Sequence, residues 1–321
     1  MGTGLLEYLW KPLSMLPPKV SYTIVHSSPG RLQKPLSRIL ASKCPESLKI
    51  RILNNTLTNP IGLAAGLNKN GNLTWLGDAL CLGFTVVGSI LPYRYKGAET
   101  KLLLRPTPLS AVNRLGLPSD GIEKVLQNIN HYRPRYTRLV ANIAGLRRND
   151  YKELSGQLGE EFLFVEVNIS CPNTEEHGTF EKPEYAEKIL IGLPASQRYL
   201  LKIPHTTNRD LLVNYVDLVK KYGLQGIVAG NTSKIWIRGF QAGLSGRPIF
   251  HGTKKMVVAL RELLGEDKII VASGGVFSAD DAIELLENGA NLIEVLTVLL
   301  RRGPRAVLDI VEGVHRYLAK R

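Results

Sequence analysis

Eight apolar runs, rich in Val, Ile and Leu, recur from residue 60 onward, and segments with helical spacing separate them. Strands that are apolar along their whole length and alternate with helices are typical of a parallel sheet. Eight such units predict closure into a (β/α)8 barrel of the TIM type, which places residues 46–321 in the α/β class. The runs span 60–66, 84–90, 138–144, 163–170, 199–203, 226–230, 268–273 and 292–299.

The segments between these runs predict the outer helices of the barrel. The clearest begins after Ser278, which precedes an acidic first turn, and ends before Gly289. Residues 147–161 have the weakest helical pattern. Ahead of the first run, residues 48–57 predict a hairpin that turns at Asn54–Asn55. The predicted helices span 72–82, 119–131, 182–192, 207–222, 253–264, 278–289 and 303–319.

Residues 1–45 differ from the barrel region. Leucines recur there at helical spacing until Pro17–Pro18, and basic residues far outnumber acidic ones. We expect a short N-terminal helical extension. The favoured interpretation is a cap packed on the barrel. The alternative is a basic amphipathic segment that lies on a membrane surface and gives access to a quinone.

Composition limits the class of protein without selecting a ligand. The chain has 321 residues, 44% of them hydrophobic and 21% charged, as in ordinary globular proteins. Its net charge of +13 suits an anionic partner such as a small acid, a nucleic acid or a membrane surface. Nothing in the pattern reveals whether copies of the chain assemble.

The three cysteines, Cys44, Cys81 and Cys171, are far apart and lack the spacing of a metal site. They predict a protein without disulfides in a reducing compartment. No run is long enough to span a bilayer, and no signal peptide is recognisable. The expected location is therefore the cytoplasm, with contact at the cytoplasmic face of the membrane as the alternative.

The run at 163–170 ends in a polar cluster that is the strongest candidate for a reactive site. Cys171 lies between Asn168 and Asn173, so a thiol stands between two neutral amides. Barrels of this type carry their working residues after the carboxyl ends of the strands. Other polar or glycine residues sit at the same position of their own strands, namely Lys69, Ser89, Asn142, Lys202, Asn231, Gly274 and Thr297.

Two features suggest where a phosphorylated cofactor would bind. Gly274–Gly275 follows the seventh apolar run, and its backbone amides, which no side chain covers, can donate to a phosphate. Residues 243–246, after the sixth apolar run, can do the same. Neither a GxGxxG opening nor a P-loop occurs, which argues against a Rossmann or nucleotide site. Lys202 ends a buried run and needs an anionic partner. That partner is either a reduced flavin or a nearby carboxylate.

Taken together, these residues resemble the dihydroorotate dehydrogenase family from about residue 50 to the end. The matching segments include Asn59–Gly66, Asn113–Arg114, Asn168–Thr174, Gly243–Pro248 and Ser273–Gly275. The resemblance implies an FMN-dependent barrel that oxidises dihydroorotate to orotate in pyrimidine synthesis. It implies that FMN is held by Ala64, Ala65, Ser89, Asn142, Lys202, Ser245, Gly246, Gly274, Gly275 and Thr297. It implies that the substrate is held by Lys69, Asn113, Asn168, Asn173, Asn231 and Thr232.

The resemblance also makes Cys171 the catalytic base, which removes the C5 proton while C6 gives hydride to flavin N5. The residue types suit this reaction. Asparagines offer a donor and an acceptor each, so several can read the edge of a pyrimidine ring, and Lys69 can neutralise its carboxylate. A thiol with an ordinary pKa of about 8.5 is mostly protonated at neutral pH, so the site has to assist its ionisation.

The chain combines features of two kinds of family member. Similarity to the quinone-linked members is found in the N-terminal segment and in residues 64–66 and 113–116. A cysteine at position 171 is instead similar to the base of the soluble members. Asn68, Leu91 and Leu296 replace an aspartate, a threonine and a tyrosine that the resemblance leads us to expect. The electron acceptor is thus open between a quinone, a soluble acceptor and a partner subunit.

Two other functions remain as alternatives. A tRNA dihydrouridine synthase is also an FMN barrel with a cysteine, and a net charge of +13 would suit RNA. The absence of room for an appended RNA-binding domain argues against it, so no nucleic-acid partner is expected. A barrel that has lost activity is the second alternative.

Overall fold

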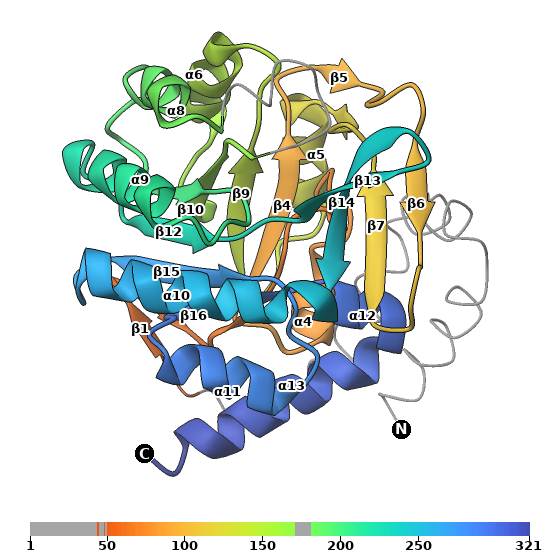
Figure 1. Cartoon of the computed structure of the whole chain (residues 1–321), viewed down its shortest axis with the longest axis vertical. Coiled ribbons are helices and arrows are strands. Elements are labelled where there is room, and N and C mark those ends of the chain that lie inside the picture. Colours follow the sequence, from red (N-terminus) through yellow and green to blue (C-terminus); the bar gives the residue numbers. More distant parts are fainter. Residues whose placement is uncertain (1–43, 45–47, 49, 171–180) are drawn as a thin grey trace.

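Eight parallel strands close into a barrel in the order β10-β11-β12-β15-β16-β3-β4-β9 (Figure 1). The computed structural model describes residues 44, 48, 50–170 and 181–321. Each barrel strand lies within or overlaps one predicted run, which confirms the predicted fold. The strands are β3 (Ile61–Leu63), β4 (Phe84–Ile90), β9 (Arg138–Ile143), β10 (Phe162–Asn168), β11 (Tyr199–Lys202), β12 (Gly226–Ala229), β15 (Ile269–Ser273) and β16 (Leu292–Val295).

Helices pack around the outside of this barrel (Figure 1). The predicted run 292–299 is too long as a strand, because the chain turns into helix α12 (Thr297–Arg302) directly after β16. The ambiguous segment 147–161 contains helix α6 (Arg148–Gln157). The other helices are α4 (Trp75–Ala79), α5 (Ile122–His131), α8 (Pro183–Leu190), α9 (Arg209–Lys221), α10 (Phe250–Leu264), α11 (Ala279–Glu287) and α13 (Pro304–Leu318), with a 3-10 turn η2 (Arg247–Ile249) before α10.

Alternation along the strands divides the core into two parts. Successive side chains of a strand point to opposite faces, so every second residue enters the barrel. Phe164 and Leu200 belong to an inner cluster, whereas Val165 and Leu201 belong to the cluster shared with the helices. The inner cluster also includes Ile52 from the N-terminal hairpin.

That hairpin is formed by β1 (Ile50–Ile52) and β2 (Asn55–Leu57). Ile52 pairs with Asn55, so the turn is at Leu53–Asn54, one residue earlier than predicted. Leu53 has a φ of 51°, in the left-handed region. Because Leu57 is also in the inner cluster, the hairpin plugs the amino end of the barrel and leaves the carboxyl end for a site.

A second, antiparallel sheet stands over the carboxyl end of the barrel, beside β4 in Figure 1. Its order is β13-β14-β7-β6, and its strands come from the loops after β4 and β12. Sequence analysis did not predict it, because its strands are short and only partly buried. They are β6 (Leu102–Leu104), β7 (Ser110–Arg114), β13 (Ser233–Ile237) and β14 (Phe240–Gly246), and a two-stranded sheet of β5 (Arg94–Tyr95) and β8 (Ser119–Asp120) lies nearby in sequence.

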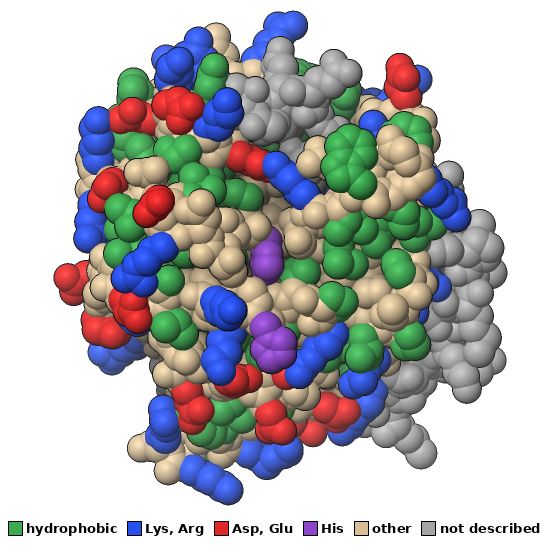
Figure 2. Space-filling view, in the orientation of Figure 1, with side chains coloured by type: hydrophobic (Ala, Val, Ile, Leu, Met, Phe, Trp, Pro, Cys, Tyr) green, Lys and Arg blue, Asp and Glu red, His purple; other side chains and the backbone are tan. Residues whose placement is uncertain are grey.

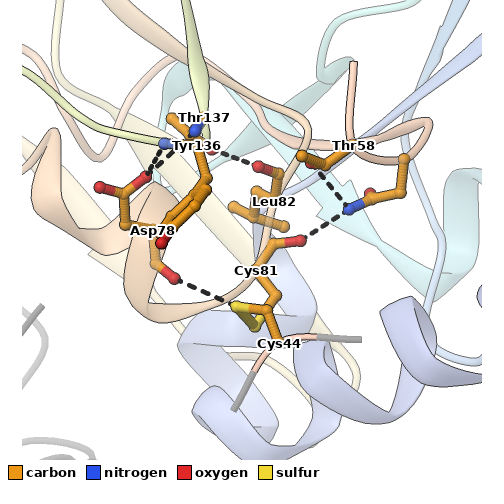
Figure 3. Close-up of a disulfide and its surroundings, with 8 residues drawn as sticks. Cys44, Thr58, Asp78, Cys81, Leu82, Tyr136 and Thr137 are labelled. Atoms are coloured by element: carbon orange, nitrogen blue, oxygen red, sulfur yellow. Dashed lines mark hydrogen bonds between the residues drawn. A yellow bond between two sulfur atoms is a disulfide. The ribbon is translucent and has the colours of Figure 1, made fainter. Parts of the chain in front are cut away.

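The prediction that the chain has no disulfide is wrong, because Cys44 and Cys81 are joined by one (Figure 3). The two residues are 37 positions apart, and spacing alone could not show that the chain returns to the end of α4. Next to the disulfide, the buried Asp78 accepts hydrogen bonds from the backbone amides of Tyr136 and Thr137 (Figure 3). The disulfide also removes the argument for a reducing compartment.

We expect the double variant C44S/C81S to be less stable than the wild type. Without the disulfide, the unfolded chain is no longer closed between residues 37 positions apart, so it gains conformational entropy. The expected loss is about 3–4 kcal/mol in the free energy of unfolding. Urea unfolding with and without dithiothreitol measures it. The reductant should destabilise the wild type and leave the variant unchanged; equal curves for the wild type under both conditions would contradict the disulfide.

In the part of the chain that the structure describes, no helix is both long enough and apolar enough to cross a bilayer. The N-terminal extension predicted over 1–45 lies, apart from Cys44, outside the described residues. Its boundary with the barrel therefore stays a prediction.

Candidate active site

A cavity of about 250 Å³ opens at the carboxyl ends of the barrel strands. Parallel strands all point one way, so the residues that follow them meet at this end. Strands β7 and β14 of the antiparallel sheet add part of the wall. The cavity brings together predicted site residues from across the sequence, namely Ala64, Ala65, Lys69, Ser89, Asn113, Asn168, Lys202, Asn231, Thr232, Ser245, Gly246, Gly274, Gly275 and Thr297.

Asn168, the last residue of β10, is the centre of a network of amides and hydroxyls. Its Nδ2 donates to Ser89 Oγ at 3.1 Å and to Asn142 Oδ1 at 3.4 Å. Its Oδ1 accepts from the Ser170 amide at 3.2 Å, and Asn231 Nδ2 donates to Ser170 Oγ at 2.9 Å. Such a network holds each amide in one orientation, which prepares the site to select a ligand by its own donors and acceptors.

Lys202, the last residue of β11, projects into the barrel between two carboxylates. Its Nζ lies 3.1 Å from Glu166 Oε2 and 2.9 Å from Glu294 Oε2. The side chains of all three are almost fully buried. Asn142 Nδ2 also donates to Glu166 Oε2, at 2.7 Å. Of the two partners left open for Lys202, the structure thus shows the carboxylate, and Lys202 and Glu294 face the cavity as well.

The pKa values of these three groups follow from burial and charge. Burial and the nearby charge of Glu294 raise the pKa of Glu166 well above its ordinary value. Burial alone would also raise the pKa of Glu294, but the Lys202 ammonium and the hydrogen bonds that Glu294 accepts together lower that pKa. Burial would lower the pKa of Lys202, and the two carboxylates instead raise it. Of the two carboxyls, Glu166 is therefore the one that holds a proton more readily.

Another part of the cavity is built from glycines that leave no room for a side chain. A Cβ on Gly246 would come within 2.2 Å of the Leu109 carbonyl oxygen, and one on Gly275 within 2.5 Å of Phe250 Cα. Both glycines have positive φ, 97° and 83°. Gly275 follows the seventh barrel strand in sequence, where barrels of this class bind phosphate. Bare backbone in such a place fits the phosphate of a mononucleotide cofactor.

Two hydroxyls complete this end. Thr297, at the start of α12, donates to Ser245 Oγ at 3.0 Å, and Ser245 donates to the Ala111 carbonyl oxygen at 3.2 Å. The cavity wall also includes the apolar Leu296 and Leu300 and the basic Arg105 and Arg301. A polar end and an apolar flank suit a ligand that joins a phosphate to a flat ring.

Not every predicted residue lies on the cavity wall. Asn142 is fully buried behind it and hydrogen-bonds to Glu166 and Asn168. Cys171 and Asn173 lie outside the described residues. Sequence analysis missed Glu166 and Glu294. Each is the only carboxylate in a buried strand, and each lies at a position whose side chain points into the barrel, so the sequence pattern could have identified both.

The charge on the surface does not gather into one basic face in the view of Figure 2. Lys and Arg side chains alternate there with Asp and Glu. Nucleic-acid binding usually needs a continuous basic patch or stripe.

Among the described residues, no group of His, Cys, Asp and Glu could hold a metal ion.

The fold and the site define a (β/α)8 barrel whose ligand cavity is at the carboxyl ends of its strands. The family model of dihydroorotate dehydrogenase matches residues 47–318, and the chain belongs to this family. It is an enzyme of a class that oxidises dihydroorotate and depends on a flavin.

Relatives and solved structures agree with this assignment. The dihydroorotate dehydrogenase (quinone) of Coxiella burnetii is 31% identical over 285 residues, which cover 79% of this chain and 80% of the relative. That of Burkholderia thailandensis is 29% identical and covers 88% of both chains. The crystal structure of DHODH from Eimeria tenella in complex with ferulenol has a TM-score of 0.76 at 22% identity, and it covers 92% of this chain and 95% of the other. This structure supports the fold alone.

Proposed function

We propose that this enzyme converts dihydroorotate to orotate with FMN bound in the cavity and Cys171 as the base. The observation that carries the proposal is the convergence of an amide network, a buried lysine and a glycine cradle on one cavity. Each of these three parts matches one part of the ligand pair: the pyrimidine ring, the flavin ring and the phosphate.

The substrate would be recognised by its hydrogen-bonding edge and its carboxylate. Asn113, Asn168, Asn231 and Thr232 offer donors and acceptors to a ring that bears amides, and Asn173 would join them. Lys69 is buried and lines the same cavity, so it can neutralise a carboxylate there. A ligand without these groups would leave buried amides unpaired, which is a strong basis for selectivity.

FMN would lie between the substrate and the glycine cradle. Ala64 and Ala65 leave space for a ring, and Ser89 and Lys202 reach it from their strands. The phosphate would be bound by Ser245, Gly246, Gly274, Gly275 and Thr297. When bound, FMN accepts the hydride from the substrate.

Cys171 would accept the proton from C5 of the substrate. It follows Ser170, whose hydroxyl and amide are already held by Asn168 and Asn231. These hydrogen bonds fix Ser170, the residue before the proposed base, and general-base catalysis requires a base within hydrogen-bonding reach of the proton that it removes.

The electron acceptor that we propose is a quinone, in keeping with the quinone class named for the relatives. Leu296 and Leu300 line the cavity and would offer such a molecule apolar contacts on its way to the flavin ring. The test is removal of residues 1–43, which keeps Cys44 and its disulfide. We expect turnover with a quinone to fall much more than turnover with a soluble dye. Equal loss with both acceptors would make the segment a structural support only.

The purified protein offers a direct test of the activity. We expect it to show flavin absorbance or to take up FMN, and dihydroorotate to bleach that absorbance. A protein that binds no FMN would favour a barrel without activity. Bound FMN that dihydroorotate cannot reduce, but that reduces uridine in tRNA in the presence of a reductant, would favour a dihydrouridine synthase.

A further inference from the structure

Three charged side chains, Glu166, Lys202 and Glu294, meet inside the barrel, and two of them, Lys202 and Glu294, line the cavity. They come from three different strands, and each is at most 5% exposed. One ammonium therefore stands between two carboxylates. The other groups that face them carry no charge: Asn142 donates to Glu166, and Ser273 is paired with Glu294 across β15 and β16. We call Glu166, Lys202 and Glu294 the buried triad.

The oxygens of the buried triad are short of donors. Lys202 binds one oxygen of each carboxyl, and Asn142 binds the same oxygen of Glu166. The Ser273 side chain also acts on the Glu294 carboxyl, but Glu294 Oε1 is buried and has no donor in hydrogen-bonding geometry among the described residues. The carboxyl groups of Glu166 and Glu294 are within hydrogen-bonding reach of each other. A proton on one of them would supply the missing donor to the other.

Charge leads to the same conclusion. With all three groups ionised, the buried triad would have a net charge of −1 without contact to water, which is costly. With one proton between the carboxyls it is neutral. We propose that Glu166 and Glu294 share one proton, and that this proton sets the charge that the cavity presents to the ring of a bound flavin. The second half of this proposal rests on the proposed function.

The raised pKa of Glu166 and the lowered pKa of Glu294 are in line with such sharing. As the pH rises, the proton is lost and the buried triad changes from neutral to −1. A flavin gains negative charge when it is reduced, so the ionised triad opposes reduction. Among the described residues, the other cations that line the cavity are Lys69, Arg105 and Arg301.

Two single variants separate this proton from other effects. In E166Q, Lys202 keeps Glu294 as its partner, and in E294Q it keeps Glu166. Both variants leave a neutral pair with no proton to lose. E262Q removes a carboxylate from the exposed pair that Glu262 forms with Arg209, and it serves as the matched control.

The first measurement is infrared spectroscopy of the protein without flavin, as a function of pH. We expect the carbonyl band of a buried protonated carboxylic acid at neutral pH in the wild type and in E262Q. The band should be absent from E166Q and from E294Q. A band that persists in both variants, or that is missing from the wild type, would overturn the inference. Because no flavin is present, this result does not depend on the proposed function.

The second measurement is the midpoint potential of bound FMN between pH 6 and 9. Loss of the proton should weaken the binding of reduced FMN relative to oxidised FMN at least tenfold, which is about 30 mV for a two-electron couple. The wild type and E262Q should show this additional decrease at high pH, and E166Q and E294Q should not. Identical pH profiles for all four proteins would overturn the role of the proton. Failure to bind FMN would instead overturn the proposed function.

Discussion

Replacing Cys171 with alanine should lower kcat for dihydroorotate by about 10²–10⁴-fold, which is the range that a positioned general base contributes. The substrate would still bind, because the amides that recognise it are on other residues. Stopped-flow absorbance measures the effect directly as the rate at which dihydroorotate bleaches bound flavin. Binding of FMN and of orotate, followed by titration, should be unchanged.

Cys171→Ser is the matched variant for this experiment. Its hydroxyl can act as a base only after it loses its own proton, which it does less readily than a thiol whose ordinary pKa is about 8.5, so only part of the activity should remain. Normal bleaching by Cys171→Ala would show that another group is the base. Loss of orotate binding in both variants would indicate a structural role for the segment rather than proton transfer.

Replacing Lys202 with methionine should strongly destabilise the protein. It leaves Glu166 and Glu294 buried without a cation, and removal of one partner from a buried ion pair typically costs about 3–5 kcal/mol. The pKa of both carboxyls then rises. A carboxyl with a raised pKa in the folded state is stabilising at low pH, and that stability is lost as the pH rises above about 4.5.

Urea unfolding at pH 5.5 and pH 8 tests this dependence. The loss in the free energy of unfolding should be larger at pH 8, because protonation of the carboxyls relieves it at pH 5.5. The triple variant K202M/E166Q/E294Q should recover most of the loss at pH 8. Lys221→Met removes a cation from an exposed pair with Glu187 and should leave stability nearly unchanged. Equal losses at both pH values would show that packing rather than charge is responsible.

The barrel was predictable because its evidence is local. Strands buried on both faces have to be apolar throughout, so runs such as 84–90 and 226–230 stand out whatever surrounds them. Helix α11 was equally clear, since Ser278 caps it with its own side chain and Asp281 completes a capping box. The polar residues after the strands were predictable for the same reason: a parallel barrel has one end at which its strands finish.

The antiparallel sheet and the hairpin turn were less visible. Strands β6 and β13 are short and partly exposed, so neither gives the continuous apolar run by which barrel strands are recognised. The turn after β1 uses Leu53 with positive φ, a conformation that sequence would assign to Asn54 or Asn55. In both cases the packing of other elements overrides a weak local preference.

The sequence by itself determined the number of barrel strands, their order along the chain and the set of polar residues at their ends, because burial and strand length leave a local pattern. Only the tertiary structure decided which of those residues meet. It joined Cys44 to Cys81, placed Asn142 behind the cavity wall, and put Glu166 and Glu294 on either side of Lys202. The physical reason is that contacts across a closed barrel depend on the register of neighbouring strands, which no single stretch of sequence contains.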